Sequence, residues 1–134
     1  MVPRPLGDLL PRLLGALALV IVGAVHLDLW LTGYSYIPSI GPLFMANVVI
    51  SWLLAVALVM ARRSSPVTTA VMTGSAVFAG GTFAAYLASI TVGLLGFHES
   101  ASRTAAAVAG AAEVGMVVVA AWWLLSNARH SRNG

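Results

Sequence analysis

Four long apolar stretches constrain the fold of this chain more than any other feature of its sequence. They cover about residues 12–31, 42–61, 67–89 and 104–125, and each has the roughly 20 mostly apolar residues needed to cross a hydrocarbon core. Lipid offers the backbone no hydrogen-bond partner, so each stretch should be a helix. The alternation of polar and apolar residues in barrel strands is missing. We therefore predict an all-α protein, a four-helix transmembrane bundle in which residues 1–134 form a single transmembrane domain.

The composition favours the same environment and excludes several classes of site. Only 8% of the residues are charged, against about 25% in soluble proteins, so most of the surface should face lipid. The chain has no cysteine, which excludes disulfides, thiolate nucleophiles and cysteine-ligated metal clusters. A net charge of +3 is too small and scattered to indicate a nucleic-acid partner. We expect a multi-pass protein of a bacterial-type plasma membrane, with the lipid bilayer as its surroundings.

The arginines predict how the bundle is oriented. Positively charged residues gather on the cytoplasmic side of membrane proteins. One outer connection contains Arg103, whereas the other six arginines fall at the opposite end: Arg4, Arg12, Arg62, Arg63, Arg129 and Arg132. Both termini are therefore expected in the cytoplasm. Aromatic residues should mark the two interfaces, with Trp30, Tyr34 and Tyr36 outside and Trp122 and Trp123 inside.

Small residues spaced four apart predict a close contact between the third and fourth spans. Ala76, Gly80 and Ala84 follow this spacing in the third span, and Gly110 and Gly115 lie on two neighbouring rows of the fourth. Such residues let helix backbones approach closely in lipid, where no hydrophobic force drives association. A tight hairpin of these two spans is expected.

Glu113 is the polar residue that most needs an explanation, because it lies near the middle of the fourth span. A charge at that depth costs about 2.5–3.5 kcal/mol on insertion scales, so it should face protein or water and find a partner. Counting 1.5 Å per residue from the outer helix ends places His26 and Asn47 within a few ångströms of its depth. We predict an intramembrane polar cluster of His26, Asn47 and Glu113, to which the third span could add Thr82 or Tyr86.

A second group of polar residues is expected at the outer mouth of the bundle: Asp28, His98, Glu99 and Arg103. Asp28 lies two residues from His26, and positions two apart do not share a helix face. It should pair with Arg103 or be solvated among the headgroups. His98 and Glu99 either fold over the mouth or remain solvated loop residues.

Three interpretations of the polar residues stay open. The cluster can be a structural clasp that holds the helices in register, a proton or small-cation relay through Glu113 and His26, or a metal or haem site. The metal candidates are His26, Glu113, His98 and Glu99, although no metal-binding spacing supports them. No cofactor is the leading expectation. No catalytic residue is predicted, since no nucleophile motif or phosphate loop occurs.

Parts of the sequence also resemble known groups of membrane proteins. The pattern "HLDLW..GY..IPSIGPLF..N" at 26–47, the segment "GLLGFHE" at 93–99 and a glutamate in the last span resemble those of a group of small four-span integral membrane proteins from actinobacteria. The chain is also similar to DoxX-like four-helix membrane proteins, in size and topology alone. The first resemblance implies a four-helix bundle with its marked residues on the outer side: His26, Gly33, Pro38, Gly41, Asn47, Glu99 and Glu113. It supplies no reaction.

The short connections leave little besides packing surface to carry a function. We therefore predict a non-catalytic accessory or scaffold subunit, bound to another membrane protein or to itself. The alternative is a small redox or transport component in which His26 and Glu113 handle a proton, a metal or a haem.

Overall fold

The computed structural model describes the backbone of residues 4–62, 65–100 and 103–132, and the side chains of these ranges from Gly7 to Arg129. The described residues form four long helices, α1 (Arg4–Leu31), α2 (Ile40–Met60), α3 (Pro66–Thr91) and α4 (Thr104–Arg132), and a short 3-10 helix, η1 (Tyr34–Tyr36), but no strand. Each long helix is long and apolar enough to cross a membrane. The prediction of an all-α, four-helix membrane bundle is confirmed, and α2 begins two residues before the predicted span.

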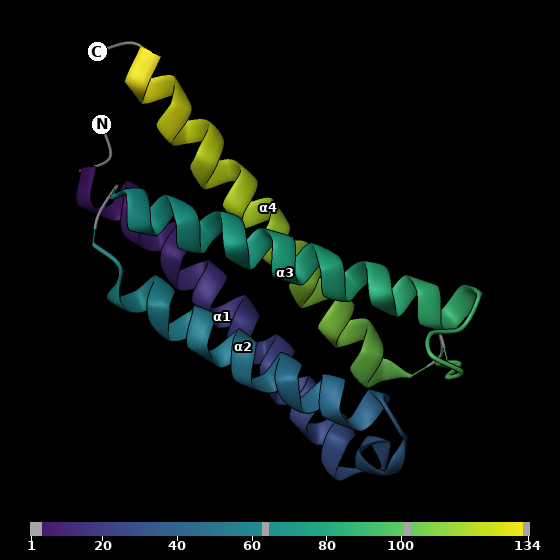
Figure 1. Ribbon diagram of the computed structural model, residues 1–134. Coiled ribbons are helices and arrows are strands. Elements are labelled where there is room, and N and C mark those ends of the chain that lie inside the picture. The colour runs from purple at the N-terminus through teal and green to yellow at the C-terminus, as the bar shows by residue number, and fades with distance from the viewer. Residues whose placement is uncertain (1–3, 63–64, 101–102, 133–134) are drawn as a thin grey trace.

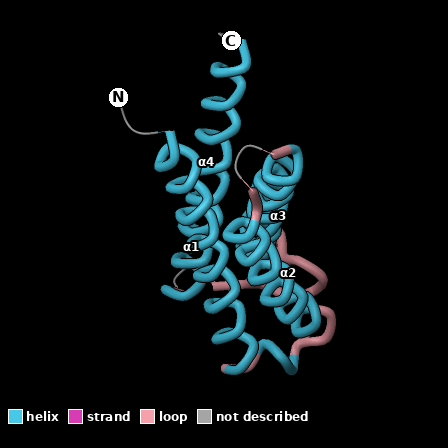
Figure 2. Tube along the Cα trace, turned by 90° about the vertical axis from the view of Figure 1, so that its left-hand side faces the viewer, coloured by secondary structure: helices cyan, strands magenta, loops and turns pink. Residues whose placement is uncertain are grey.

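The helices run up and down around the bundle (Figures 1 and 2). α1 begins and α4 ends at the end of the bundle where α2 passes into α3. α1 packs extensively on α2 and α4, and α3 packs on α4, whereas α2 and α3 touch over a much smaller stretch. The bundle is therefore closed on three sides and loosely closed on the fourth, between α2 and α3.

Two apolar cores fill the bundle at different levels. The larger core lies toward the end with the chain termini and contains the fully buried Leu19, Leu58, Met72 and Met116, one from each helix. The smaller core holds Leu29, Tyr34 and Ile40 at the opposite end.

The starts of two helices follow local signals. The Ser65 hydroxyl accepts a hydrogen bond from the Thr68 amide at 3.2 Å, and Pro66 occupies the first turn of α3, an arrangement that satisfies an otherwise unpaired donor. The connection from α1 to α2 is tighter. A Cβ at Gly41 would lie 2.7 Å from the Ser35 carbonyl oxygen, so only glycine lets α2 start against η1.

Arg12 joins α1 to the end of α2 by a buried network. Its guanidinium donates to the carbonyls of Leu58 at 3.0 Å and Val59 at 2.9 Å and also to that of Ala61. These are the last carbonyls of α2, which have no partner within their own helix. The Asp8 carboxylate lies 3.7 Å from Arg12 and accepts a hydrogen bond from the Trp123 indole at 2.8 Å.

This network buries two residues that were expected toward the cytoplasmic end. Arg12 was counted among the arginines of that end and Trp123 was expected as an interface aromatic, and they are 5% and 3% exposed. Trp122, by contrast, is 47% exposed. The side chains of Arg4 and Arg132 and all of Arg63 lie outside the described residues.

The small residues of α3 and α4 differ in what they face. A Cβ at Gly110 would lie 3.3 Å from the Phe83 ring, and one at Gly80 would lie 3.9 Å from Val117. Ala76 packs beside the larger core. Ala84 is exposed, and a Cβ at Gly115 would meet no atom within 4 Å. Ala84 and Gly115 therefore do not bring α3 and α4 together.

The tightest glycine of the larger core lies in α1 and was not singled out from the sequence. A Cβ at Gly15 would lie 3.2 Å from both Leu58 and Met116. We expect Gly15→Leu to lower the free energy of unfolding by about 1–3 kcal/mol through overpacking. Gly115→Leu makes the same change in helix propensity in open space and should raise the free energy of unfolding by about 0.5–1 kcal/mol. Reversible unfolding in detergent micelles measures both, and equal losses would contradict the packing described here.

Candidate functional site

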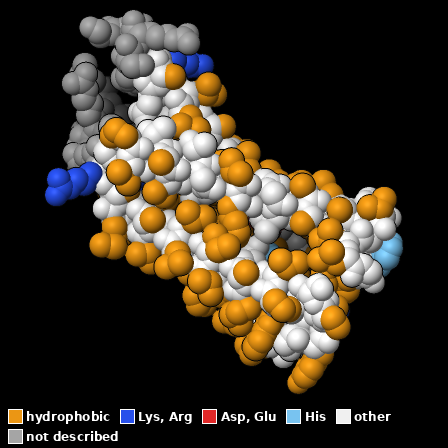
Figure 3. Space-filling view, in the orientation of Figure 1, with side chains coloured by type: hydrophobic (Ala, Val, Ile, Leu, Met, Phe, Trp, Pro, Cys, Tyr) orange, Lys and Arg blue, Asp and Glu red, His pale blue; other side chains and the backbone are white. Residues whose placement is uncertain are grey.

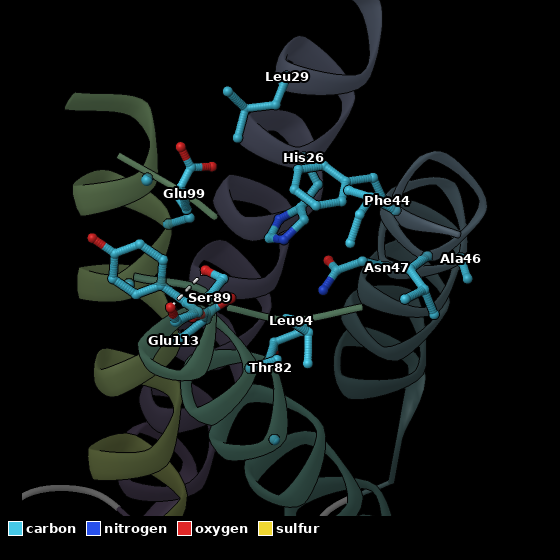
Figure 4. Close-up of a pocket in the computed structure, with 18 of the residues that line it drawn as sticks. His26, Leu29, Phe44, Ala46, Asn47, Thr82, Ser89, Leu94, Glu99 and Glu113 are labelled. Atoms are coloured by element: carbon cyan, nitrogen blue, oxygen red, sulfur yellow. Dashed lines mark hydrogen bonds between the residues drawn. The ribbon is translucent and has the colours of Figure 1, made fainter. Parts of the chain in front are cut away.

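A cavity of about 420 Å³ lies between the four helices and is the main candidate site. The three residues predicted as an intramembrane polar cluster, His26 from α1, Asn47 from α2 and Glu113 from α4, all line it (Figure 4). Thr82 and Tyr86 of α3 also line it. The cavity volume falls within the range of small-molecule binding sites.

Glu113 faces the inside of the bundle and not the lipid. It is 2% exposed, and among the described residues its Oε2 atom has no hydrogen-bond partner. Thr82 lies beside the carboxyl, but its hydroxyl donates to the carbonyls of Phe78 at 2.7 Å and Ala79 at 3.2 Å. Burying an unpaired carboxyl oxygen is costly, so this atom is a point at which a ligand could bind.

Asn47 and His26 each use one side-chain atom within their own helix. The Oδ1 atom of Asn47 accepts from Ser51 at 3.0 Å, and its buried Nδ2 atom has no partner among the described residues. The Nδ1 atom of His26 lies 2.8 Å from the Val22 carbonyl oxygen. Since a carbonyl only accepts, Nδ1 must carry a proton. The other polar atoms of the two side chains, Asn47 Nδ2 and His26 Nε2, remain available to hydrogen-bond a molecule in the cavity.

The expected mutual hydrogen bonds between His26, Asn47 and Glu113 are not formed in the described part of the chain. The three residues share a cavity but bond elsewhere or not at all. The physical reason is the separation of α2 from α3, which leaves space where a direct contact would be needed.

The cavity opens sideways, between α2 and α3. Its lining includes residues of these helices with large exposed fractions: Leu43 at 50% and Ile50 at 42% in α2, and Val77 at 70% in α3. Figure 3 shows a hollow on this face, surrounded by apolar side chains. In a membrane this apolar rim would lie against acyl chains.

The end of the cavity away from the chain termini, which is the predicted outer end, is closed by a contact between the two connections that lie there. The Tyr34 hydroxyl donates to Glu99 Oε2 at 2.5 Å, and Arg103 lies 3.8 Å from Glu99 Oε1 and 5.2 Å from the centre of the Tyr34 ring. Tyr34 also stacks on Phe44 and meets the edge of Phe97. Phe97 and Glu99 line both this cavity and a smaller outer pocket of about 330 Å³, so they form the wall between the two.

The residues predicted at the outer mouth therefore separate into two groups. Glu99 and Arg103 take part in the closure, and Tyr34 is buried beside them. Asp28 is exposed, and the expected Asp28–Arg103 pair is not formed because Arg103 lies against Glu99. His98 is exposed and lines the outer pocket beside Gly93.

The contact of Tyr34 with Glu99 and Arg103 predicts how the stability of the protein depends on pH. Burial raises the pKa of the Tyr34 phenol, and the hydrogen bond and charge of Glu99 raise it further. A raised pKa means that the folded state holds the proton more tightly than the unfolded state, whose tyrosine ionises near pH 10. The stability that Tyr34 contributes should be complete below about pH 10 and fall as the pH rises further. The free energy of unfolding, measured from pH 8 to 12, should fall less in Tyr34→Phe than in the unmodified chain. Tyr36→Phe is the control, because Tyr36 is 88% exposed, and it should follow the unmodified chain.

The described residues contain no group of three or more His, Asp or Glu side chains that could hold a metal ion. The metal candidates lie in different places: His26 and Glu113 line the cavity, His98 lines the outer pocket, and Glu99 lies in the wall between the two. The arrangement is suited to hydrogen bonding with a small molecule, because single polar atoms from different helices face one apolar space.

Comparison with known proteins adds no relative: no family model, no curated protein and no solved structure matches the chain. The resemblances to actinobacterial four-span proteins and to DoxX-like proteins therefore remain predictions from the residues quoted above. What stands independently of them is a multi-pass membrane protein with four candidate membrane-spanning helices.

Proposed function

We propose that this protein is a non-catalytic subunit of a bacterial plasma membrane that binds a small molecule taken up from the lipid phase. The observation that carries the proposal is the cavity, which is open to the side and contains two buried polar atoms without partners, Asn47 Nδ2 and Glu113 Oε2. Buried polar atoms are almost always paired in folded proteins, so two exceptions in one cavity require an explanation, and a bound molecule supplies one.

The orientation belongs to the same proposal. Arg12, Arg62 and Arg129 lie toward the end of the bundle where α1 begins and α4 ends, whereas Arg103 lies at the other end. The excess of arginine favours a cytoplasmic location for the first end. The closure around Glu99 then faces the outside.

An accessory role suits a protein with so little mass outside its helices. Its partner is a larger membrane protein or a second copy of the chain. Cross-linking in native membranes, followed by purification in mild detergent and mass spectrometry, identifies that partner. Recovery of an uncross-linked monomer alone would contradict the accessory role without affecting ligand binding.

Ligand binding is tested by blocking the opening. A Cβ at Gly81 meets no atom within 4 Å, and Gly81 lines the cavity, so Gly81→Phe should fill the space between α2 and α3. Gly74 lies seven residues earlier in α3, is equally open and does not line the cavity. We expect mass spectrometry to find a small molecule retained by the unmodified protein and by Gly74→Phe but lost from Gly81→Phe. Equal retention by all three would overturn the proposal.

A proton relay is the second candidate, favoured by the placement of His26, Glu113 and Glu99 along one cavity. Histidine and carboxyl side chains inside membranes often carry protons. In liposomes containing a pH-sensitive dye, a relay predicts proton flux that Glu113→Gln abolishes. A binding protein predicts no flux above that of empty liposomes.

A further inference from the structure

The cavity's polar atoms restrict the kind of molecule it can hold, and this step rests on the proposed function. Three helices each contribute one atom that has no hydrogen bond among the described residues: His26 Nε2, Asn47 Nδ2 and Glu113 Oε2. Figure 4 shows the three side chains around one space. The remaining lining is mostly apolar.

The hydrogen-bonding capacity of these atoms is mixed. Because His26 Nδ1 carries its proton toward Val22, Nε2 of the neutral ring has a free lone pair and accepts. The Glu113 carboxyl only accepts when it is ionised, and when it is protonated it has one O–H donor beside its remaining acceptor capacity. Asn47 Nδ2 only donates. A matching ligand group must therefore both donate and accept.

A hydroxyl group meets this requirement, whereas ammonium, carboxylate, phosphate and simple carbonyl head groups do not. An ammonium group only donates, which leaves the Asn47 amide facing a cation. A carboxylate or phosphate only accepts and would lie against Glu113. A ketone or ester carbonyl accepts from Asn47 but offers nothing to His26 or Glu113. A charged head group would also have to leave water for a largely apolar space.

The opening determines the rest of the molecule. The rim between α2 and α3 is formed by exposed apolar residues such as Leu43, Ile50 and Val77, so an apolar tail can extend through it into lipid. We infer that the cavity binds an uncharged amphiphile with a hydroxyl head group, held between Glu113, His26 and Asn47, and with an apolar tail that leaves between α2 and α3. Long-chain alcohols and alkylated hydroquinones both have this chemistry.

The test compares probes that differ only in the hydroxyl proton. Protein in nanodiscs is titrated with 1-decanol, with decyl hydroquinone and with the methyl ether of each, and binding is corrected for empty nanodiscs. We expect saturable binding of one molecule per chain and about tenfold weaker binding of the matching ether, the ratio expected when a buried acceptor loses its donor. Tighter binding of 1-decanol or of decyl hydroquinone tells which source of the hydroxyl the cavity prefers.

Variants connect the binding to two of the three side chains, Glu113 and Asn47. Glu113→Leu and Asn47→Leu should each weaken binding of the hydroxylated probe about tenfold and reduce its advantage over the ether, whereas Glu113→Gln should largely retain it. Asn127→Leu makes the same chemical change as Asn47→Leu outside the cavity and should bind like the unmodified protein.

The outcomes separate the two proposals. Equal binding of hydroxyl and ether probes overturns the inference about the head group and leaves ligand binding intact. If no probe binds while the purified protein retains another molecule, the inference about the head group is again overturned and ligand binding again stands. Failure of all probes together with no retained molecule means that water alone fills the cavity and overturns both.

Discussion

Replacing Glu113 by leucine is expected to raise the free energy of unfolding by about 2 kcal/mol. The carboxyl is 2% exposed and its Oε2 atom lacks a partner in the described structure, and an unsatisfied buried polar group costs about 1–3 kcal/mol. Leucine is similar in size and removes that cost. Unfolding of purified, ligand-free protein in detergent micelles measures the change, and Glu113→Gln should lie close to the unmodified chain because it keeps a polar group in the same place.

A loss of stability in Glu113→Leu would instead identify a structural role for the carboxyl. If Glu113→Leu lowered stability by more than about 1 kcal/mol, the carboxyl would have to be holding neighbouring helices together, as in the structural-clasp interpretation. A gain in stability combined with loss of the retained molecule would mark the residue as kept for binding. Active and binding sites commonly carry such destabilising groups.

Arg12→Leu should have a large effect in the other direction and lower the free energy of unfolding by about 3–5 kcal/mol. The guanidinium donates to three carbonyls at the end of α2 and lies 3.7 Å from Asp8. Leucine would leave those carbonyls and a largely buried carboxylate without their partner. Thermal or denaturant unfolding in micelles measures the loss.

Two further variants test the cause of this loss. Arg12→Lys keeps the charge but not the planar fork that reaches several acceptors at once, so it should recover only part of the stability. Arg62→Leu removes an exposed arginine at the same end of the bundle and should change stability by less than about 0.5 kcal/mol. If Arg12→Leu behaved like Arg62→Leu, the buried network would be contradicted.

The helices could be predicted because the length of an apolar run is itself a physical requirement for crossing a membrane. The predicted third span began at residue 67, and α3 begins at Pro66 because Ser65 caps its first turn. The second helix begins earlier than predicted. Gly41 lets the backbone of α2 approach η1, a contact between two segments that no local pattern reports.

The candidate site was predictable in depth but not in detail. Counting residues from the helix ends placed His26, Asn47 and Glu113 at one level, and all three line one cavity. Whether they touch depends on how far α2 stands from α3, which follows from the packing of all four helices together. The side opening and the role of Glu99 in closing the outer end depend on this spacing as well.

The burial of Arg12 and Tyr34 was not predicted, for a related reason. Rules for arginine and aromatic residues in membrane proteins describe where such residues gather on average. They do not include partners from distant parts of the chain, such as Leu58 for Arg12 and Glu99 for Tyr34. Each partner lies more than 45 residues away, so neither pairing leaves a local signal in the sequence.

The loose contact between α2 and α3 has a thermodynamic consequence. A molecule that reaches the cavity through this side is supplied by the bilayer, so its occupancy follows its concentration among the lipids and not its concentration in water. A compound with weak intrinsic affinity can therefore saturate the protein if it partitions strongly into membranes. At low occupancy and at the same concentration in water, two compounds with equal affinity from the lipid phase will differ in occupancy by the ratio of their partition coefficients.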